Sequence, residues 1–310
     1  MRIGLALGGG GLTGGAFHAG VLGALADSGW DARTAEVLLG TSAGAITAAS
    51  LAAGMPPTDM VRRQLGEPVS PAAATLLDRL STDARGFATS ERRVRAPASP
   101  DLLRAMLRNP RQAHPGKLAA AALPIGRVSA DIIARGMDEL CGGRWPSDQL
   151  RVTALRLRDG ETVVFGRPGA VRPTVGQAVA ASCAIPGYFT PVTIADERYA
   201  DGGTTSACNA DKLLPESLDM VIVSAPMAIH SGVRLAPDAL WRRVIRRQVD
   251  GEIGRLRAAG TAVFLFAPTA DVAAAMGPNP MAAGKERSVT QAAYRAACTR
   301  INADSRLRHL

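Results

Sequence analysis

The stretch that decides the fold is EVLLGTSAGAITAASLAAG, residues 36–54. Its first four residues predict a short apolar strand, and its last twelve predict an alanine-rich helix. Between them lies the pattern G-x-S-x-G at 40–44, which places Ser42 on a sharp strand-to-helix turn. Such a turn directs a serine hydroxyl out of the carboxyl edge of a sheet, with the free N–H groups of the helix behind it. The bare pattern also occurs in plain turns, but this context favours Ser42 as a nucleophile.

The chain begins with another strand and helix. Residues 2–7 (RIGLAL) predict a strand, residues 8–15 (GGGGLTGG) a glycine-rich loop, and residues 16–28 a helix. Followed by residues 36–54, this order predicts a three-layer α/β fold with a largely parallel sheet. Two successive parallel strands would place the glycine-rich loop beside Ser42 at one edge of that sheet.

The glycine-rich loop fits two kinds of site. Gly9, Gly11 and Gly14 satisfy G-x-G-x-x-G, a pattern of dinucleotide-binding sites. Such a site needs an acidic residue at the end of the second strand, where this chain has Gly-Thr-Ser-Ala-Gly. Backbone N–H groups of the same glycines can instead converge on one point, as an oxyanion hole requires. A dinucleotide-binding oxidoreductase therefore stays a distant alternative.

A third signal is Asp201-Gly202-Gly203, which follows a predicted strand. Asp-Gly is also a common turn, so the tripeptide alone indicates little. A serine nucleophile needs a base, however, and a triad of the α/β-hydrolase type would have to use His230 or His309. In that fold the nucleophile follows several strands, whereas Ser42 follows only two. A carboxylate that acts directly on the serine fits better.

As an ordered set, these motifs resemble the patatin-like phospholipases. The set comprises the glycine-rich loop, GTSAG, the segment ASCAIPGYFTPV at 181–192, and Asp-Gly-Gly. The resemblance is anchored over about residues 2–56 and 174–226 and is weak elsewhere. It implies a three-layer patatin-like fold, and a lipid acyl hydrolase of the phospholipase A or esterase kind that acts on lipid esters.

The resemblance also implies roles for particular residues. Ser42 is the nucleophile and Asp201 the general base of a Ser–Asp dyad, which works through an acyl-enzyme intermediate. The oxyanion hole is formed by backbone N–H groups of Gly9, Gly10 and Gly11. No metal and no cofactor are implied. We expect Ser42→Ala and Asp201→Asn each to abolish esterase turnover, and His230→Ala to have little effect.

Neighbouring residues are expected to support these motifs. Thr13 departs from the family pattern, which often has Arg or Lys there, so an anion-holding role at this position is in doubt. Asn209 either supports the loop of Asp201 by hydrogen bonding or forms a turn. Structural roles are expected for Ser182, Pro186, Tyr188, Phe189, Gly14, Gly40, Gly44, Gly202 and Gly203.

The rest of the chain predicts a single domain over residues 1–310. A basic helical cap is expected at about 55–130, and helices and strands that complete the fold at about 235–310. A hairpin is expected around Asp159-Gly160. Further strands are predicted at 192–194, 198–200, 220–226 and 262–268, and helices at 174–182, 237–258 and 284–308.

The composition and charge of the chain limit the classes of binding partner that we expect. Hydrophobic residues make up 47% of the chain and charged residues 20%, which excludes wholesale disorder. The net charge of +9 favours acidic partners. The run 85–117 and a helix face with Arg242, Arg243, Arg246 and Arg247 are either solvated or contact anionic lipid. No nucleic-acid motif is present, so no nucleic-acid partner is expected.

We predict the cellular compartment from targeting and membrane-spanning segments and from the pattern of the cysteines. The apolar run at the start is too short for a signal peptide, and no stretch predicts a membrane-spanning helix. The four cysteines form no framework and are expected to be reduced. We expect a cytoplasmic protein, and peripheral contact with the inner face of the membrane stays open.

Two further alternatives remain. A broad carboxylesterase with little preference for phospholipids would use the same residues. A non-catalytic lipid-binding or regulatory protein would keep the fold, although the intact serine, aspartate and glycine set argues against it.

Overall fold

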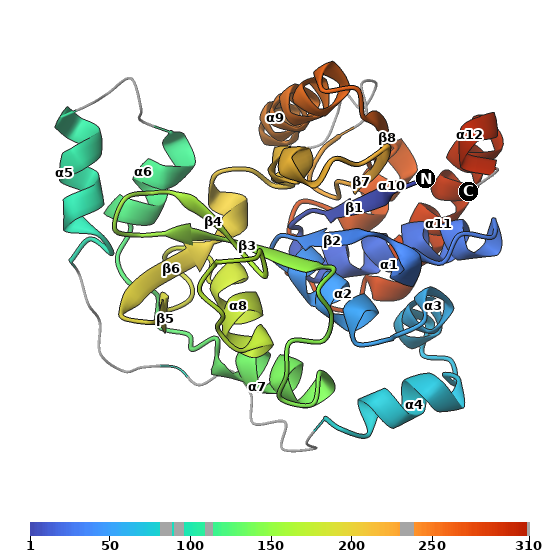
Figure 1. The fold of residues 1–310 in the computed structure, drawn as a ribbon, viewed down its shortest axis with the longest axis horizontal. Coiled ribbons are helices and arrows are strands. Elements are labelled where there is room, and N and C mark those ends of the chain that lie inside the picture. The colour runs from blue at the N-terminus through green and yellow to red at the C-terminus, as the bar shows by residue number, and fades with distance from the viewer. Residues whose placement is uncertain (81–88, 90–95, 109–113, 230–238, 309–310) are drawn as a thin grey trace.

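An eight-stranded sheet forms the centre of the computed structural model (Figure 1). The structure describes residues 1–80, 89, 96–108, 114–229 and 239–308. The strand order is β5-β6-β3-β2-β1-β7-β8, with β4 also paired to β3. The strands are β1 Ile3–Leu7, β2 Val37–Gly40, β3 Leu150–Arg156, β4 Thr162–Phe165, β5 Val192–Ile194, β6 Glu197–Asp201, β7 Met220–Ser224 and β8 Ala262–Phe266.

Most of the sheet is parallel, as the sequence predicts. Strand β1 pairs in parallel with β2 and β7, β2 pairs in parallel with β3, and β7 pairs in parallel with β8. Strands β4, β5 and β6 pair antiparallel to their neighbours, and β3 and β4 form the predicted hairpin. Strands β1, β2 and β7 are buried along their whole length, which explains their continuous apolar sequences.

Two different strands, β2 and β6, pair with the same edge of β3. Val152 pairs with both Gly40 of β2 and Phe165 of β4, and Ala154 pairs with both Val163 of β4 and Asp201 of β6. Because a strand residue has one neighbour on each side, β2 and β6 lie end to end on the edge opposite β4. The end of β2 and the end of β6 therefore meet beside the middle of β3.

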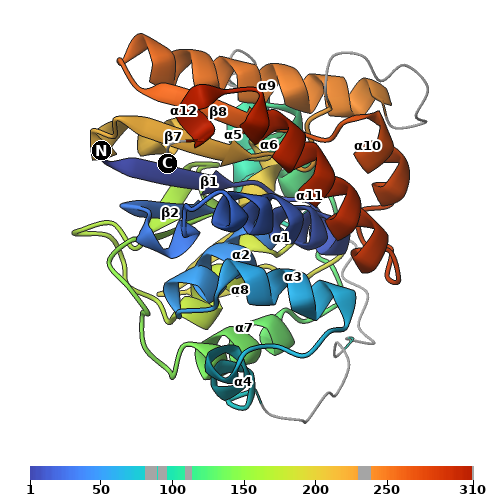
Figure 2. The ribbon, with the colours of Figure 1, turned by 90° about the vertical axis from the view of Figure 1, so that its right-hand side faces the viewer.

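Helices cover both faces of the sheet and make the predicted three layers (Figure 2). The larger core packs α1 Gly11–Asp27, α2 Ala43–Ala52, α8 Val175–Ser182 and α11 Glu286–Asn302 on one face. The other core packs α9 Ala239–Ala258 and the 3₁₀ helix η4 Ala210–Glu216 on the opposite face. Shorter elements are η1 Ala32–Thr34, η3 Gly202–Thr204, α7 Asp131–Leu140, α10 Ala270–Met276 and α12 Ser305–Arg308.

The glycine-rich loop is shorter than predicted. Helix α1 begins at Gly11, so the loop after β1 is Gly8 to Gly10, and the predicted start at residue 16 is wrong. A tertiary contact supports the earlier start, because the Thr13 N–H donates to Pro280 O at 3.1 Å, and the Gly14 N–H makes the first bond of the helix, to Gly10 O at 2.8 Å. These contacts hold a glycine-rich turn in a helical conformation that its sequence alone disfavours.

The segment expected to form a cap contains short helices that lie in two places. They are α3 Pro57–Leu65, α4 Pro71–Leu77, α5 Pro100–Arg108 and α6 Pro115–Ala122, and each begins with a proline at its first position. Helix α3 packs against α1 and α11, whereas α5 and α6 lie at the far side of the molecule near β4 (Figure 1). Much of the predicted basic run, Arg85, Arg92, Arg93, Arg95 and Arg111, lies outside the described residues.

The predicted basic face of α9 is wrong at one position. Arg242 is 1% exposed, and its guanidinium donates to Pro226 O and Gly277 O at 3.1 Å each. Arg246 is engaged as well, with Asp250 at 2.8 Å. The i, i+3, i+4 spacing groups these arginines, but packing against the sheet buries one of them. Among the described residues, no helix combines the length and the apolar character needed to span a bilayer.

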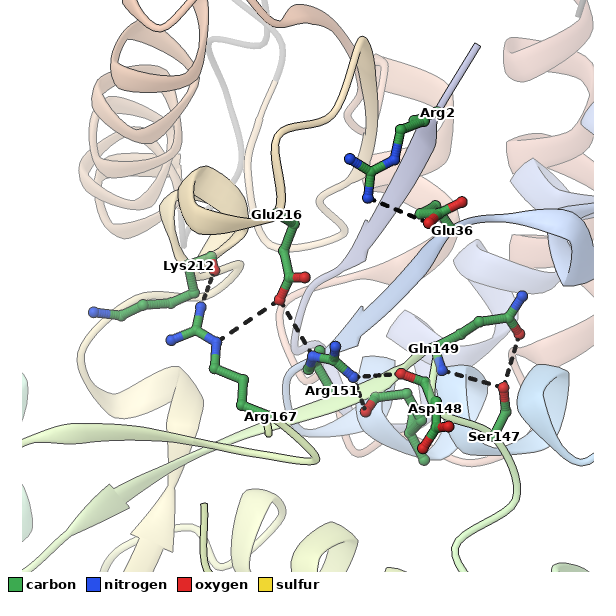
Figure 3. A network of polar contacts seen from close by, with 10 residues as sticks. Arg2, Glu36, Ser147, Asp148, Gln149, Arg151, Arg167, Lys212 and Glu216 are labelled. Atoms are coloured by element: carbon green, nitrogen blue, oxygen red, sulfur yellow. Dashed lines mark hydrogen bonds and ion pairs between the residues drawn. The ribbon is translucent and has the colours of Figure 1, made fainter. Parts of the chain in front are cut away.

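A polar network ties together the amino ends of the central strands (Figure 3). Arg151 at the start of β3 donates to Asp148 O at 2.6 Å and lies 3.3 Å from Glu216. Arg167 lies 3.9 Å from the same Glu216 carboxylate and donates to Lys212 O. These contacts fasten η4 and the end of the hairpin to the sheet.

Candidate active site

Ser42 lies on a strained turn between β2 and α2. Its backbone has φ 54° and ψ −122°, a conformation that costs a non-glycine residue about 1–3 kcal/mol. A Cβ at Gly44 would lie 2.0 Å from Leu7 O, and one at Gly40 would lie 2.4 Å from the Cα of Ala45. Only glycine therefore fits on either side of this turn, which lets α2 pack directly against β1.

The structure brings Ser42 and Asp201 together. The Ser42 hydroxyl donates to Asp201 Oδ2 at 2.7 Å, although the two residues are 159 positions apart. Their meeting follows from the sheet, because Ser42 follows the end of β2 and Asp201 ends β6 on the same edge of β3. The side chains lie in a nearly closed site, with Ser42 8% exposed and Asp201 5% exposed.

The Asp201 carboxyl group is held in an environment with little opposite charge. Its Oδ1 accepts the N–H of Gly203 at 2.6 Å, and its Oδ2 accepts the hydroxyl of Ser42. Burial raises the pKa of Asp201 to about 6, against the opposing effect of these two hydrogen bonds. A carboxylate with this pKa is a stronger base than an exposed one and is still mostly ionised at neutral pH.

The glycine-rich loop lies directly against Ser42, but its amides are not equivalent. A Cβ at Gly9 would be 3.2 Å from the Cβ of Ser42. The Gly9 N–H, a predicted oxyanion donor, donates to Ala207 O at 2.8 Å and is therefore not a free donor in this structure. Within the described residues, the N–H groups of Gly10 and Gly11 donate to no protein acceptor. They open α1, so they also carry its positive end.

His18 belongs to the scaffold of the loop. Its Nε2 lies 2.7 Å from Gly8 O and its Nδ1 lies 2.8 Å from the Ser224 hydroxyl. Because the carbonyl can only accept, Nε2 carries the proton and Nδ1 accepts from Ser224. Burial lowers the pKa of His18 to about 4, so the ring is neutral. The predicted alternatives for a catalytic histidine, His230 and His309, lie outside the described residues.

Three buried polar residues near Ser42 and Asp201 make hydrogen bonds that the sequence did not predict. Ser182 Oγ accepts the backbone N–H of Ser42 at 2.8 Å, which holds the strained turn. Thr41 and Thr153 join their hydroxyls at 2.8 Å between β2 and β3. A buried serine or threonine next to a motif is the only signal that the sequence offers for such a role.

Asn209 takes the supporting role that the sequence left open. Its Nδ2 donates to Gly202 O at 3.2 Å and to Ser206 O at 2.8 Å, while its own backbone has φ 53°. It therefore both forms a turn and holds the loop that follows Asp201. Gly202 is needed for space, since a Cβ there would lie 2.6 Å from Thr153 O.

The ASCAIPGYFTPV segment packs around the dyad from the outside. Phe189 is buried and Tyr188 is half exposed, and their rings meet edge to face at 4.8 Å. Cys183 is buried beside Ser42 and Asp201, and burial raises the pKa of its thiol well above the usual value. Of these three residues, Cys183 is the one in contact with the Ser42–Asp201 pair. No cluster of three metal-ligating side chains occurs in the described part of the chain.

A groove of about 400 Å³ lies between α1, α2 and α3, and its lining includes Ala43, the residue that follows Ser42. Gly11, Leu12, Ile46 and Met60 line it as well. Arg63 and Glu286 stand among the lining residues as its charged members. The lining is therefore mostly apolar with charge at few points, as a site for an aliphatic chain requires.

Comparison with known proteins places the chain in a family. The sequence profile of the patatin-like phospholipases matches residues 5–214, which contain Ser42 and Asp201. The crystal structure of VipD from Legionella pneumophila is similar, with 15% sequence identity and a TM-score of 0.47. That match covers 99% of this chain and 66% of the VipD chain. No curated protein sequence matches the chain. The resemblance predicted from the ordered motifs is confirmed, and the chain belongs to the patatin-like phospholipase family, whose members are generally lipid acyl hydrolases.

Proposed function

We propose that this protein is a lipid acyl hydrolase in which Ser42 is the nucleophile and Asp201 is the general base. The observation that carries the proposal is the 2.7 Å hydrogen bond between the Ser42 hydroxyl and Asp201 Oδ2. A serine hydroxyl becomes an effective nucleophile when a base within this distance takes its proton. The strained turn of Ser42 supports the same role, because such conformations gather at active sites.

The reaction runs in two halves. Asp201 takes the Ser42 proton as the serine oxygen attacks the ester carbonyl, and the tetrahedral intermediate collapses to release the alcohol, which receives that proton. The acyl group remains on Ser42. Asp201 then takes a proton from water, the water oxygen attacks the acyl-enzyme, and the fatty acid leaves as the proton returns to Ser42.

The oxyanion formed in both halves needs donors, and we propose the N–H groups of Gly10 and Gly11. Both belong to the turn that touches Ser42, and the positive end of α1 adds to their effect. The N–H of Ala43 opens α2 directly behind the nucleophile and is a third candidate. Gly9 contributes by its lack of a side chain, since any Cβ would crowd Ser42.

The groove beside Ser42 supports a lipid substrate. An acyl chain bound in the groove would lie beside Gly11 and Ala43, the first residues of α1 and α2, and Ala43 directly follows Ser42. Burying one methylene group contributes about 0.8 kcal/mol. A true lipid hydrolase should therefore prefer long acyl chains, whereas a broad carboxylesterase should not.

The test combines labelling with a panel of substrates. The wild-type protein should react with a fluorophosphonate probe and hydrolyse esters, and Ser42→Ala should lose both. Esters with chains of 4 to 16 carbons, followed by phospholipid vesicles, separate a lipid hydrolase from a carboxylesterase. A folded wild-type protein that takes up no probe would support the non-catalytic lipid-binding alternative and refute the proposal.

We also propose peripheral contact with an anionic membrane, supported by the net charge of +9. Binding to vesicles should rise with the fraction of phosphatidylglycerol and fall with added salt. Binding that ignores the phosphatidylglycerol fraction would refute this contact. A cytoplasmic location at the inner face of the membrane would follow from it.

A further inference from the structure

A second cavity lies on the α9 side of the sheet. It has a volume of about 420 Å³, is open to solvent, and is bordered by α6, β4, η4 and α9. Four cationic side chains line it, from three different elements: Lys117, Lys212, Arg247 and Arg255. Two carboxyl groups line it as well, so the wall carries an excess of positive charge. The groove beside Ser42 shares none of these lining residues.

The acidic groups of this cavity are already engaged. Asp211 lies 3.0 Å from Arg255, which neutralises one cation. Glu252 is 3% exposed and accepts the N–H of Ala210 at 2.9 Å. Burial raises the pKa of Glu252 to about 7, so at neutral pH this carboxyl group is ionised in only part of the molecules. Neither acid is thus available to neutralise a further cation.

Three cations of the cavity have no acidic partner among the residues that the structure describes. Among the described residues, no carboxylate lies within ion-pair distance of Lys117, Lys212 or Arg247. The hydroxyls of Thr162 and Thr205 also line it, but they are engaged, because they lie 2.9 Å from each other and the Thr205 hydroxyl donates to Gly202 O at 3.3 Å. The donors left for a ligand are the ammonium and guanidinium groups, which recognise phosphate oxygens.

The same cavity is joined to the loop of Asp201. Ser206 and Asn209 line it, and Asn209 Nδ2 donates to Ser206 O at 2.8 Å and to Gly202 O at 3.2 Å. Gly202 follows Asp201 directly. A ligand that shifts Asn209 would therefore change the position of the carboxylate that faces Ser42, as a coupling between two sites requires.

We infer that this cavity binds a phosphate group, held by Lys117, Lys212 and Arg247, and that its occupant is coupled through Asn209 to the loop of Asp201. The phosphate can belong to a lipid headgroup or to a soluble phosphate ester, since the recognised chemistry is the same. The volume exceeds that of a phosphate ion alone and accommodates a glycerol phosphate. The binding is independent of the proposed hydrolase function, whereas the coupling rests on it.

The first experiment measures binding to the full-length protein by titration calorimetry. The probes are inorganic phosphate, glycerol 3-phosphate, and vesicles with and without phosphatidic acid, each at matched ionic strength. Arg247→Gln and Lys117→Gln should each weaken binding of the recognised probe about tenfold. Arg243→Gln removes the same charge from α9 at a position outside the cavity and should leave the affinity unchanged within about twofold.

The pattern of probes identifies the source of the phosphate. Binding of glycerol 3-phosphate in solution indicates a soluble ester, and binding only to phosphatidic acid vesicles indicates a lipid headgroup. If no probe binds, or if Arg243→Gln weakens binding as much as Arg247→Gln, the cavity is not a phosphate site.

The second experiment tests the coupling with an uncharged, water-soluble ester. The probe that binds should change kcat in a saturable way, with a half-saturation that Arg247→Gln raises about tenfold. Asn209→Ala should remove the response while the protein still binds the probe. A probe that binds to a hydrolytically active protein without changing kcat would overturn the coupling and leave the binding site in place. Failure of the hydrolase proposal would appear instead as a protein that binds the probe but neither hydrolyses esters nor takes up fluorophosphonate.

Discussion

The two ends of the central strands both hold buried polar networks, and these networks differ in charge. At the carboxyl ends of β2 and β6, Asp201 accepts hydrogen bonds from neutral donors, the Ser42 hydroxyl and the Gly203 amide. At the amino end of β3, Glu216 instead faces two guanidinium groups, those of Arg151 and Arg167 (Figure 3). One carboxylate is stabilised by dipoles alone, and the other is stabilised by full opposite charges.

The difference teaches which carboxylate is free to take a proton. A guanidinium partner fixes the position of a carboxylate through charge-assisted hydrogen bonds, which suits a structural bond. Without such a partner, burial raises the pKa of Asp201 to about 6 and makes its carboxylate more basic. The amino-end network should therefore matter for stability, and the carboxyl-end network should matter for turnover.

The largest effect in this comparison is expected from Asp201→Asn, which removes the carboxylate at the carboxyl end of the sheet. We expect kcat/KM for an ester to fall by at least about a thousandfold, since a general base commonly contributes about 10²–10⁴. Because the pKa of Asp201 is raised on folding, the native protein binds more protons than the unfolded chain between about pH 4 and pH 6. Ionised Asp201 therefore costs stability above pH 6, and Asn should increase the free energy of unfolding at pH 8 by about 1–3 kcal/mol.

Rates and urea unfolding at pH 8 check both halves of that expectation. A variant that is inactive because it is unfolded would appear in the urea curve. An Asp201→Asn protein that is folded and fully active would refute the dyad.

A pH profile gives the next largest effect. The base works only when ionised, so kcat/KM should fall as pH decreases through about 6, with the ionisation of one group. At pH 5 the rate should be about a tenth of the rate at pH 8. A water-soluble ester with no ionisable group keeps the profile free of substrate titration. A rate that stays constant down to pH 4.5 would contradict the assignment of Asp201 as the base.

A smaller effect is expected from Ser182→Ala. The substitution removes the acceptor of the Ser42 N–H, which holds the strained turn, and leaves the two reacting side chains in place. A hydrogen bond of this kind contributes about 1 kcal/mol, so kcat should fall about fivefold with little change in KM. Fluorophosphonate labelling should slow by a similar factor. A loss in KM alone would show that Ser182 acts on substrate binding.

The amino end of the sheet should show the opposite behaviour. Glu216→Gln leaves the nearly buried Arg151 without a full counter-charge, and we expect about 2–4 kcal/mol lower stability in urea unfolding. Activity per folded molecule should stay within about twofold of wild type. Glu36→Gln is the matched control, because its pair with Arg2 is half exposed and should contribute less than about 1 kcal/mol. A large loss of activity in folded Glu216→Gln would show that the two networks are not separate.

Local sequence patterns predicted most of the sheet and the strand-to-helix turn that carries Ser42. The strand, turn and helix around Ser42 are encoded within 19 residues, so the turn could be read directly. The partnership with Asp201 came from the resemblance to a family, and its geometry depends on two strands sharing an edge of β3. No local pattern encodes such a pairing.

The errors share a physical cause as well. Gly9 and Arg242 were assigned by position in a motif or on a helix face, yet tertiary partners decide their state. Ala207 O takes the Gly9 amide, and Pro226 O and Gly277 O bury the Arg242 guanidinium. Ser182 was expected to have a structural role, but its particular partner, the Ser42 amide, lies 140 residues away in the sequence.

Because β2 and β6 share an edge of β3, the distance between Ser42 and Asp201 depends on the number of residues in β3. Strand β2 pairs up to Val152 and β6 begins to pair at Ala154, so Thr153 is the single residue opposite the junction. Deleting one residue here would shorten the strand by about 3.3 Å and turn every following side chain to the other face. Natural length variation in this protein should therefore be tolerated in loops but not within β3, even though β3 supplies neither reacting group.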